Sequence, residues 1–224
     1  MTYFLKAICG ALLVTGAANA EFALNSYRAD QPHRIGDVDT FQLTDGGCSE
    51  LRYNLRRFGG ETTDCAQRRQ RIEYRETQGA KAGETRIYEW DMLVPKEFRF
   101  ASAGGWLVPA HLHDRDGVIY NFSLQDDGLW FHGGLCIDPD EFGTWHRVSL
   151  TVTYDATRKA SISDKTAGVV QVRCNGELIR DLSGRPNILP NQEAFFGYGL
   201  MGPQKIVSGD MPQVSFRNVS VTRP

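Results

Sequence analysis

Short runs of residues that alternate between apolar and polar recur along the chain, separated by polar or glycine-rich turns. This two-residue period predicts β-strands, because successive side chains of an extended strand point to opposite faces. The clearest run covers residues 85–94, and its aromatic-rich face is expected to be core: Arg86, Tyr88, Trp90, Met92 and Val94. Further strands are predicted at residues 41–43, 50–58, 70–77, 106–113, 118–124, 129–132, 144–153, 169–174, 177–181, 195–201 and 214–222.

Two dipeptides mark tight hairpins between predicted strands, Asp127-Gly128 and Asn175-Gly176. Such pairs favour two-residue turns, in which both positions adopt positive φ angles. A chain with about ten to twelve strands and no convincing helix is typical of an all-β fold. We therefore predict a two-sheet antiparallel β-sandwich, a concanavalin-like jelly roll.

The first twenty residues have the features of a signal peptide. Lys6 supplies the positive charge, an apolar run follows, and Ala18-Asn19-Ala20 resembles a cleavage site. Residues 21–224 are expected to form a single domain, and no later segment is apolar enough to cross a membrane. We therefore expect a secreted or periplasmic monomer.

The number of cysteines in the chain agrees with export. Cys9 lies in the signal peptide, which leaves an even number of cysteines in an oxidising compartment, and these are expected to form two disulfides. Three pairings are possible; we favour Cys48–Cys65, closing a local loop, and Cys136–Cys174, joining neighbouring strands. Zinc binding is not favoured, because no Cys-x-x-Cys pair occurs.

Charge is balanced overall but uneven along the chain. The formal net charge of −2 argues against nucleic-acid binding. Arginines crowd one quarter of the sequence, where they form either a solvated basic surface or a site for a polyanion. They are Arg52, Arg56, Arg57, Arg68, Arg69, Arg71 and Arg75.

Two separated segments carry polar groups on one strand face. In the first, Arg71, Glu73 and Arg75 share a face opposite to Ile72 and Tyr74. The second, residues 111–113, places two histidines on one face and a leucine on the other. If the two polar faces coincide, the resulting surface suits an acidic ligand.

These segments resemble motifs of the jelly-roll polysaccharide lyases, a superfamily that includes alginate, glucuronan and heparin-lyase-like members. Residues 71–75 match a charged Arg-x-Glu-x-Arg strand, and His111-Leu112-His113 stands where the family has Gln-x-His. Residues 195–201 resemble a late strand usually written Tyr-Phe-Lys-x-Gly-x-Tyr. The order of the motifs is the family's, and the likeness spans most of the mature chain.

The resemblance implies β-elimination on an acidic, uronate-containing polysaccharide, without a cofactor. Arg71 or Arg75 would pair the substrate carboxylate, since a guanidinium group matches it bidentately. His113 would be the catalytic histidine, and His111 would take the place of the amide that helps to neutralise charge. Glu73 is expected to fix the guanidinium groups.

The late strand departs from the family, because Gly197 and Met201 occupy the usual lysine and tyrosine positions. A thioether cannot transfer a proton, and Tyr198 lies on the opposite face by parity. Tyr120 is therefore a candidate for the missing hydroxyl, and loss of catalysis with retention of glycan binding is the alternative.

Aromatic and histidine residues near the second segment are candidates for sugar binding or for metal binding. Trp130 is the tryptophan best placed to stack on a sugar, and His132 is a further candidate for substrate binding. A histidine-ligated metal site is less favoured. It would combine His111, His113 and His132, but the glutamate expected a few residues after the first pair is absent.

Overall fold

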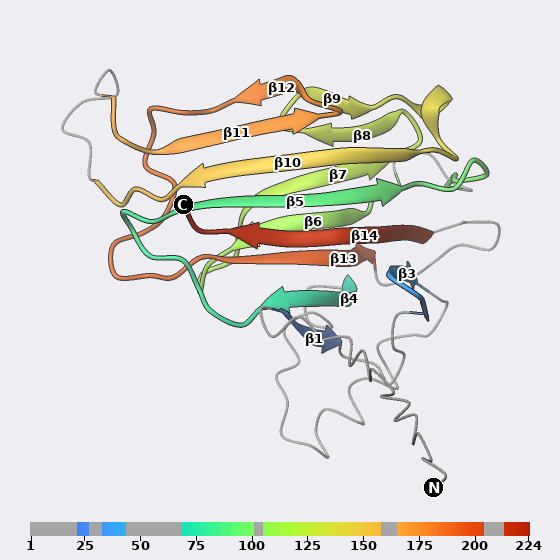
Figure 1. Ribbon diagram of the computed structural model, residues 1–224, viewed down its shortest axis with the longest axis horizontal. Helices are drawn as coiled ribbons and strands as arrows, with labels where there is room; N and C mark the ends of the chain where they lie inside the picture. The colour runs from blue at the N-terminus through green and yellow to red at the C-terminus, as the bar shows by residue number, and fades with distance from the viewer. Residues whose placement is uncertain (1–21, 27–32, 44–68, 101–104, 158–164, 204–212) are drawn as a thin grey trace, which may run out of the picture.

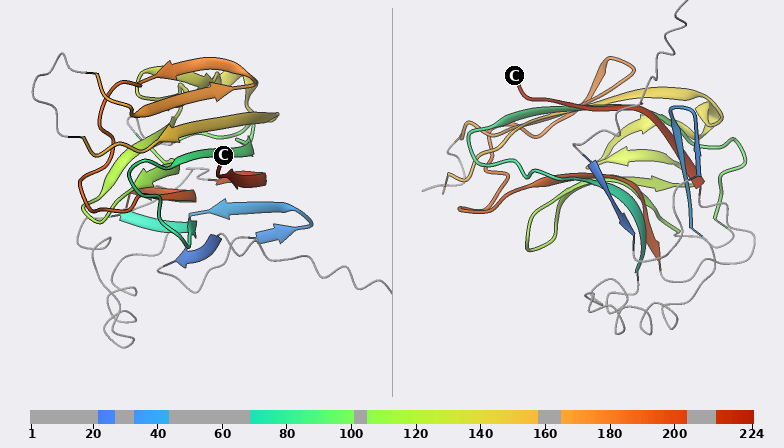
Figure 2. Two further views of the ribbon diagram at one scale, coloured as in Figure 1. Left: turned by 60° about the vertical axis from the view of Figure 1, so that its left-hand side comes forward. Right: turned by 60° about the horizontal axis from the view of Figure 1, so that its bottom comes forward.

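The computed structural model describes residues 22–26, 33–43, 69–100, 105–157, 165–203 and 213–224. In these ranges, two antiparallel sheets of seven strands each pack face to face (Figures 1 and 2). The predicted two-sheet β-sandwich is confirmed. Within the same ranges, no helix is long and apolar enough to cross a membrane.

The first sheet contains the two polar segments identified in the sequence. Its strands, in spatial order, are β1 (Phe22–Ser26), β4 (Arg69–Glu76), β13 (Phe195–Pro203), β6 (Val108–His113), β7 (Val118–Gln125), β8 (Gly128–Phe131) and β9 (Gly134–Ile137). The second sheet runs β12 (Glu177–Asp181), β11 (Val169–Cys174), β10 (Trp145–Thr153), β5 (Thr85–Leu93), β14 (Gln213–Thr222), β3 (Val38–Gln42) and β2 (His33–Ile35). A short 3₁₀ helix, Pro139–Glu141, precedes β10.

The core lies between the sheets and is rich in aromatic side chains. On β5, alternate residues are buried as the sequence predicted, and the ring of Trp90 lies edge-on to Phe122 of the opposite sheet, with centroids 5.3 Å apart. The ring of Phe196 of β13 stacks on that of Tyr88, with centroids 4.6 Å apart. Packing of the two inner faces therefore fixes which face of β4, β13 and β6 points outward.

A buried ion pair joins the two sheets near one end of the sandwich. Arg86 of β5, predicted to lie on the core face, donates to Glu76 of β4, and both side chains are almost fully buried. Tyr88 donates to the same carboxylate at 3.2 Å. Burial raises the pKa of Glu76, and the positive charge of Arg86 opposes this effect. The inward arginine is thus tolerated because its charge is paired.

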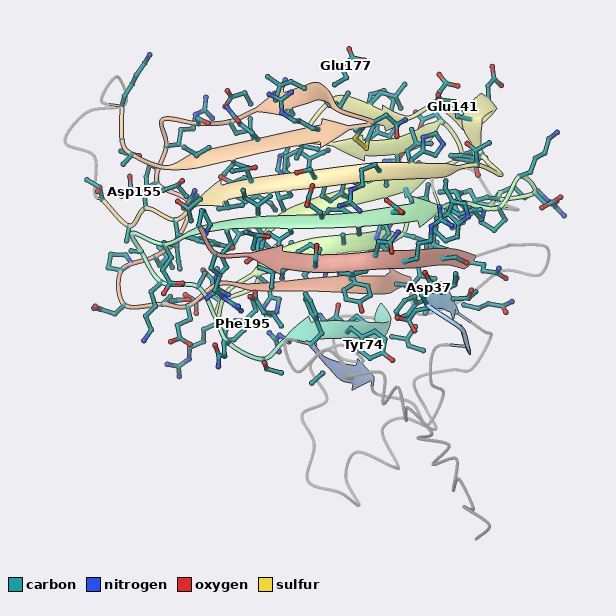
Figure 3. The ribbon with its side chains drawn as sticks, in the orientation of Figure 1. Asp37, Tyr74, Glu141, Asp155, Glu177 and Phe195 are labelled. Atoms are coloured by element: carbon teal, nitrogen blue, oxygen red, sulfur yellow. A yellow bond between two sulfur atoms is a disulfide. The ribbon has the colours of Figure 1, made fainter. Side chains whose placement is uncertain are left out.

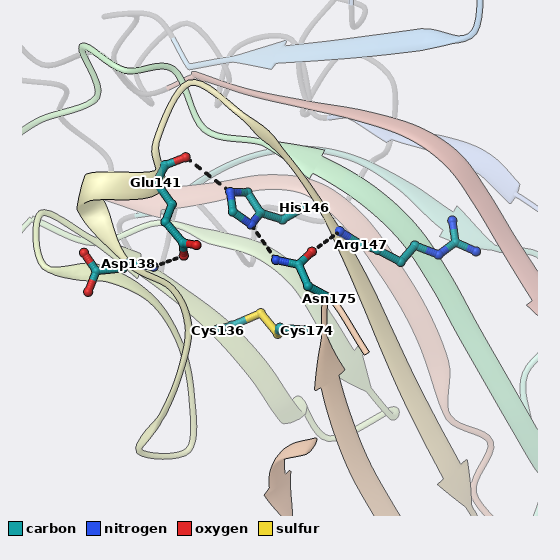
Figure 4. Close-up of a disulfide and its surroundings, with 7 residues drawn as sticks. All are labelled: Cys136, Asp138, Glu141, His146, Arg147, Cys174 and Asn175. Carbon is teal, nitrogen blue, oxygen red and sulfur yellow. Dashed lines mark hydrogen bonds between the residues drawn. A yellow bond between two sulfur atoms is a disulfide. The ribbon is translucent and has the colours of Figure 1, made fainter. Parts of the chain in front are cut away.

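The Cys136–Cys174 disulfide is confirmed, with Cα atoms 5.5 Å apart (Figure 4). The cysteines do not lie on neighbouring strands as expected, because β9 belongs to the first sheet and β11 to the second, so the bond cross-links the sheets. Beside it, the amide of Asn175 donates to Nδ1 of the buried His146 at 3.0 Å. The predicted Cys48–Cys65 pair lies outside the described residues.

Both predicted hairpins are present. Asn175 and Gly176, with φ angles of 50° and 87°, connect β11 to β12, and Gly128 begins β8 directly after the other turn. No pattern in the sequence predicts β1, β2 and β9, which are short strands of three to five residues at sheet edges. The strand predicted at residues 50–58 lies outside the described residues.

Candidate functional site

Three neighbouring strands, β4, β13 and β6, bring the two polar segments together. In the register, Arg75 is opposite Gly197, and Gly197 is opposite His111. Ile72 of β4 and Leu112 of β6 point into the core. The polar residues therefore share the face of the first sheet that points away from the second sheet, which we call the outer face. They are Arg71, Glu73, Arg75, His111 and His113.

Arg75 and His113 meet across β13. Nε of Arg75 donates to Nε2 of His113 at 2.5 Å, and Nη2 lies 2.6 Å from Nδ1. Phe195, labelled in Figure 3, stacks on the His113 ring with centroids 5.6 Å apart, and the Arg75 guanidinium carbon lies 5.3 Å from the phenyl centroid. This guanidinium group is therefore held by an imidazole and a phenyl ring.

Glu73 occupies the centre of the outer face. One carboxylate oxygen, Oε1, lies 3.2 Å from Nη1 of Arg71, and the other, Oε2, lies 3.4 Å from Nε2 of His111. The carboxylate is almost completely buried, with 1% of the residue exposed. The expectation that Glu73 fixes a guanidinium group agrees with the first contact. The second contact, to His111, was not foreseen.

These contacts across β13 depend on its glycines. A Cβ atom at position 197 would lie 3.2 Å from Cε1 and Nε2 of His111 and 3.3 Å from Oε2 of Glu73. At Gly199, where φ is +144°, a Cβ atom would lie 2.4 Å from the carbonyl oxygen of Ile72. The bare backbone of β13 lets side chains from the strands on either side meet above it.

Both histidines are held in the neutral form. Burial, together with the charges of Arg71 and Arg75, lowers the pKa of His111 to about 3. Burial, His111 and Arg75 likewise lower the pKa of His113 to about 3. The exposed fractions are 2% and 4%, so the histidines are buried and do not form a solvent-exposed strand end. At neutral pH both imidazoles are therefore uncharged.

The side chains of β13 lie on the faces that alternation along the strand predicts. Met201 lies on the outer face, where its sulfur atom accepts a 3.7 Å hydrogen bond from Nη2 of Arg71. Tyr198 points into the core, with its ring centroid 5.5 Å from that of Tyr74. The outer face at position 201 therefore carries a thioether that contacts Arg71.

Tyr120 does not reach the histidines. A bulge between β6 and β7 leaves Tyr120 opposite Leu112, on the inner face, and leaves Asn121 opposite His111. The ring of Tyr120 instead contacts His132, at a centroid distance of 5.3 Å. Among the tyrosines in the described ranges, none has its side chain on the outer face beside His113. The expectation that Tyr120 supplies the missing hydroxyl is wrong for this geometry.

Trp130 shares the outer face with the polar residues. It pairs with Ser123, which is two residues beyond Asn121 on β7, and its ring nitrogen donates to Asp127 at 3.0 Å. His132 lies in the turn after β8 with φ of +46°, and its ring also contacts Phe131 at 4.9 Å. The structure therefore separates His132 from the outer face but keeps Trp130 on it.

Sequence reasoning missed two residues of this face. Asn121 could have been found from the alternation along residues 118–124 only if the bulge were known, since a one-residue shift changes the face. Phe195 was noted as part of a motif, but its contact with both Arg75 and His113 depends on the register between β13 and β6.

Metal binding finds no support in this part of the chain. Within the described ranges, no three side chains among histidine, cysteine, aspartate and glutamate are grouped so that they could hold an ion.

Comparisons with known proteins were made on sequence and on structure. No family model matches the sequence, and no curated protein matches it. In structure, the chain resembles the alginate lyase AlgAT5 of polysaccharide lyase family 7, with 18% identity, 91% of this chain and 94% of that chain covered, and a TM-score of 0.58. It also resembles the endo-β-1,4-glucuronan lyase of the fungus Trichoderma reesei, with 13% identity, 92% of each chain covered and a TM-score of 0.62. The chain therefore has the jelly-roll fold found in these polysaccharide lyases.

Proposed function

We propose that this protein is an exported polysaccharide lyase that cleaves an acidic, uronate-containing polysaccharide by β-elimination. The observation that carries the proposal is the outer face itself, where Arg71 and Arg75 lie beside two neutral imidazoles. Two structures that share the fold, at TM-scores of 0.58 and 0.62, are named as alginate and glucuronan lyases. Export through residues 1–20 would bring the protein to such polymers.

The residues present fit the requirements of the reaction. Elimination needs a cation to neutralise the uronate carboxylate, a base to take the C5 proton, and an acid to protonate the departing glycosidic oxygen. Arg75, and Arg71 beside it, would pair the carboxylate, because a planar guanidinium group matches it with two parallel hydrogen bonds. An imidazole would provide the base, and Trp130 would offer an aromatic surface to a neighbouring sugar.

The test is direct. Purified protein is incubated with alginate, polyglucuronate and other uronate polymers, and formation of the C4=C5 double bond is followed by ultraviolet absorbance. We expect product from at least one polymer and none from a neutral glucan. Lack of product from every uronate would overturn the proposal.

A second function is favoured by Gly197 and Met201. Because these residues replace the lysine and tyrosine of the resembling family, the chain could bind an acidic glycan without cleaving it. Such a protein would bind uronate oligomers with an affinity that falls as salt increases, and it would release no unsaturated product. Turnover that depends on either histidine of the outer face would refute this second function.

A further inference from the structure

The two histidines of the outer face have different partners, and this decides which of them has an available lone pair. Both ring nitrogens of His113 face Arg75: Nε donates to Nε2 at 2.5 Å, and Nη2 lies 2.6 Å from Nδ1, which is also 3.2 Å from the carbonyl oxygen of Asp114. A guanidinium group only donates, so Arg75 engages the lone pair of His113 on whichever nitrogen carries it. Nε2 of His111 instead lies 3.4 Å from a carboxylate oxygen of Glu73 and, among the described residues, has this carboxylate beside it without a formed hydrogen bond. A neutral imidazole facing a carboxylate places its proton on that side.

The available lone pair therefore belongs to His111. The lone pair of His113 is already used by a guanidinium N–H, so a proton could be accepted there only if Arg75 moved away. His111 has its proton on Nε2 and its lone pair on Nδ1, and no described residue hydrogen bonds to Nδ1. The resemblance to lyases implied the reverse assignment, with His113 as base and His111 in the place of an amide that neutralises charge.

We propose that His111, oriented by Glu73, removes and returns the proton in the elimination, and that His113 holds Arg75 in place for the substrate carboxylate. This inference rests on the proposed function. Nδ1 takes the C5 proton, and the C5–H electrons form the C4=C5 double bond. The C4–O bond breaks, its electron pair stays on the glycosidic oxygen, and the imidazolium returns the proton to that oxygen. No tyrosine hydroxyl is needed, and no further reactant is consumed.

Glu73 and Gly197 are positioning residues in this scheme. The carboxylate of Glu73 offsets the positive charge that appears on His111 during the reaction, as a buried carboxylate does for a catalytic histidine. Gly197 provides the space in which the two side chains meet. Pairing of the substrate carboxylate with Arg71 and Arg75 would also reduce the repulsion that these cations exert on an imidazolium.

Exchange of each histidine for glutamine separates the two assignments. We expect His111→Gln to lower kcat by about 10²-fold or more with little change in KM, the range for loss of a general acid–base group. His113→Gln should raise KM and lower kcat by less than about tenfold. The opposite ranking, with His113→Gln inactive and His111→Gln active, would overturn the inference and leave the proposed lyase function intact.

The matched control is His146→Gln, which removes an equally buried histidine from β10 of the second sheet; His146 and His113 are each 4% exposed. This change should leave kcat unaltered. A further pair tests the positioning role, because Glu73→Gln should lower kcat and Glu73→Asp should restore part of it. Equal activity of the two Glu73 variants would count against a role for the carboxylate.

Ring ¹⁵N chemical shifts of the unliganded protein at neutral pH give a readout that needs no substrate. We expect His111 protonated on Nε2, with Glu73→Gln or Gly197→Ala changing the His111 signals more than those of His113. Lack of turnover in the wild type together with this tautomer would reject the lyase function but keep the assignment of the His111 proton. A proton on Nδ1 of His111 would overturn the assignment, whatever the activity.

Discussion

Acidification from pH 7 to pH 5 should destabilise this protein through the two histidines of the outer face. Each has its pKa lowered from 6.5 to about 3 by burial and by nearby positive charge. The unfolded chain therefore binds protons that the folded chain does not bind in this interval. Since protons favour the state that binds them, the free energy of unfolding must fall as the pH falls below 6.5.

The magnitude follows from the two pKa values. A site with a pKa of 6.5 in the unfolded chain and about 3 in the folded chain loses about 2 kcal/mol of stabilisation between pH 7 and pH 5. Asp91, Asp155 and Asp181 contribute little in this window, because their pKa values are lowered and they titrate at more acidic pH. The lowered pKa of His132 acts in the same direction as those of His111 and His113, and the raised pKa of Glu76 acts in the opposite direction, but both are common to wild type and variant.

The assay is urea unfolding at pH 7 and at pH 5, for the wild type, His111→Gln and His113→Gln. Each variant should lose about 2 kcal/mol less than the wild type between the two pH values, because it lacks one group that takes up a proton on unfolding. The absolute stability of the variants is not the test, since glutamine changes local packing. An equal pH dependence in all three proteins would refute the reasoning that these imidazoles are neutral because they are buried.

Three further predictions concern stability and binding. Replacing both Cys136 and Cys174 with serine should cost about 4 kcal/mol in denaturant unfolding, because the bond closes a loop with a sequence separation of 38, and a loss below about 1 kcal/mol would contradict this. Glu76→Gln should lower the thermal stability by about 3 kcal/mol, since Arg86 would keep a buried charge without its partner. Glu89→Gln, which removes an exposed pair with Arg147, is the control and should cost under about 1 kcal/mol. Arg75→Ala should weaken binding of a uronate oligomer about tenfold or more and reduce its salt dependence, as measured by titration calorimetry at low and high salt; unchanged affinity would show that the carboxylate binds elsewhere.

The sequence supported prediction of the sandwich because its signals are local. Alternation along residues 85–94 and the Asn175-Gly176 turn depend only on residues close in the chain, and both predictions are confirmed. Alternation also predicted the common face of Arg71, Glu73 and Arg75. By contrast, short edge strands such as β9 bury too little to need a strong apolar pattern.

What the sequence could not provide was the relation between strands. Tyr120, the candidate for the missing hydroxyl, lies on the inner face because the bulge after Leu112 shifts β7 by one residue, and nothing in the sequence of either strand indicates this bulge. The pairing of Cys136 with Cys174 was correct, but its role as a link between sheets depends on the position of β9. Likewise, the contact of Glu73 with His111 spans β13, which is more than eighty residues away in sequence from both strands.

The chain departs from the lyase motifs at positions 197 and 111, and these two departures are best understood together. A lysine at position 197 would place a Cβ atom 3.2–3.3 Å from His111 and Glu73, so these two side chains would have to shift by a few tenths of an ångström. Its charge would also change the electrostatics of the face. With both imidazoles neutral, Arg71, Arg75 and Glu73 sum to a single positive charge, which is the complement of one uronate carboxylate. Glycine at 197 therefore suits the close approach of His111 and Glu73. Under the proposed function, the space beside Gly197 would let a carboxylate orient an imidazole, and this imidazole would perform the proton transfer for which the thioether of Met201 is unsuited.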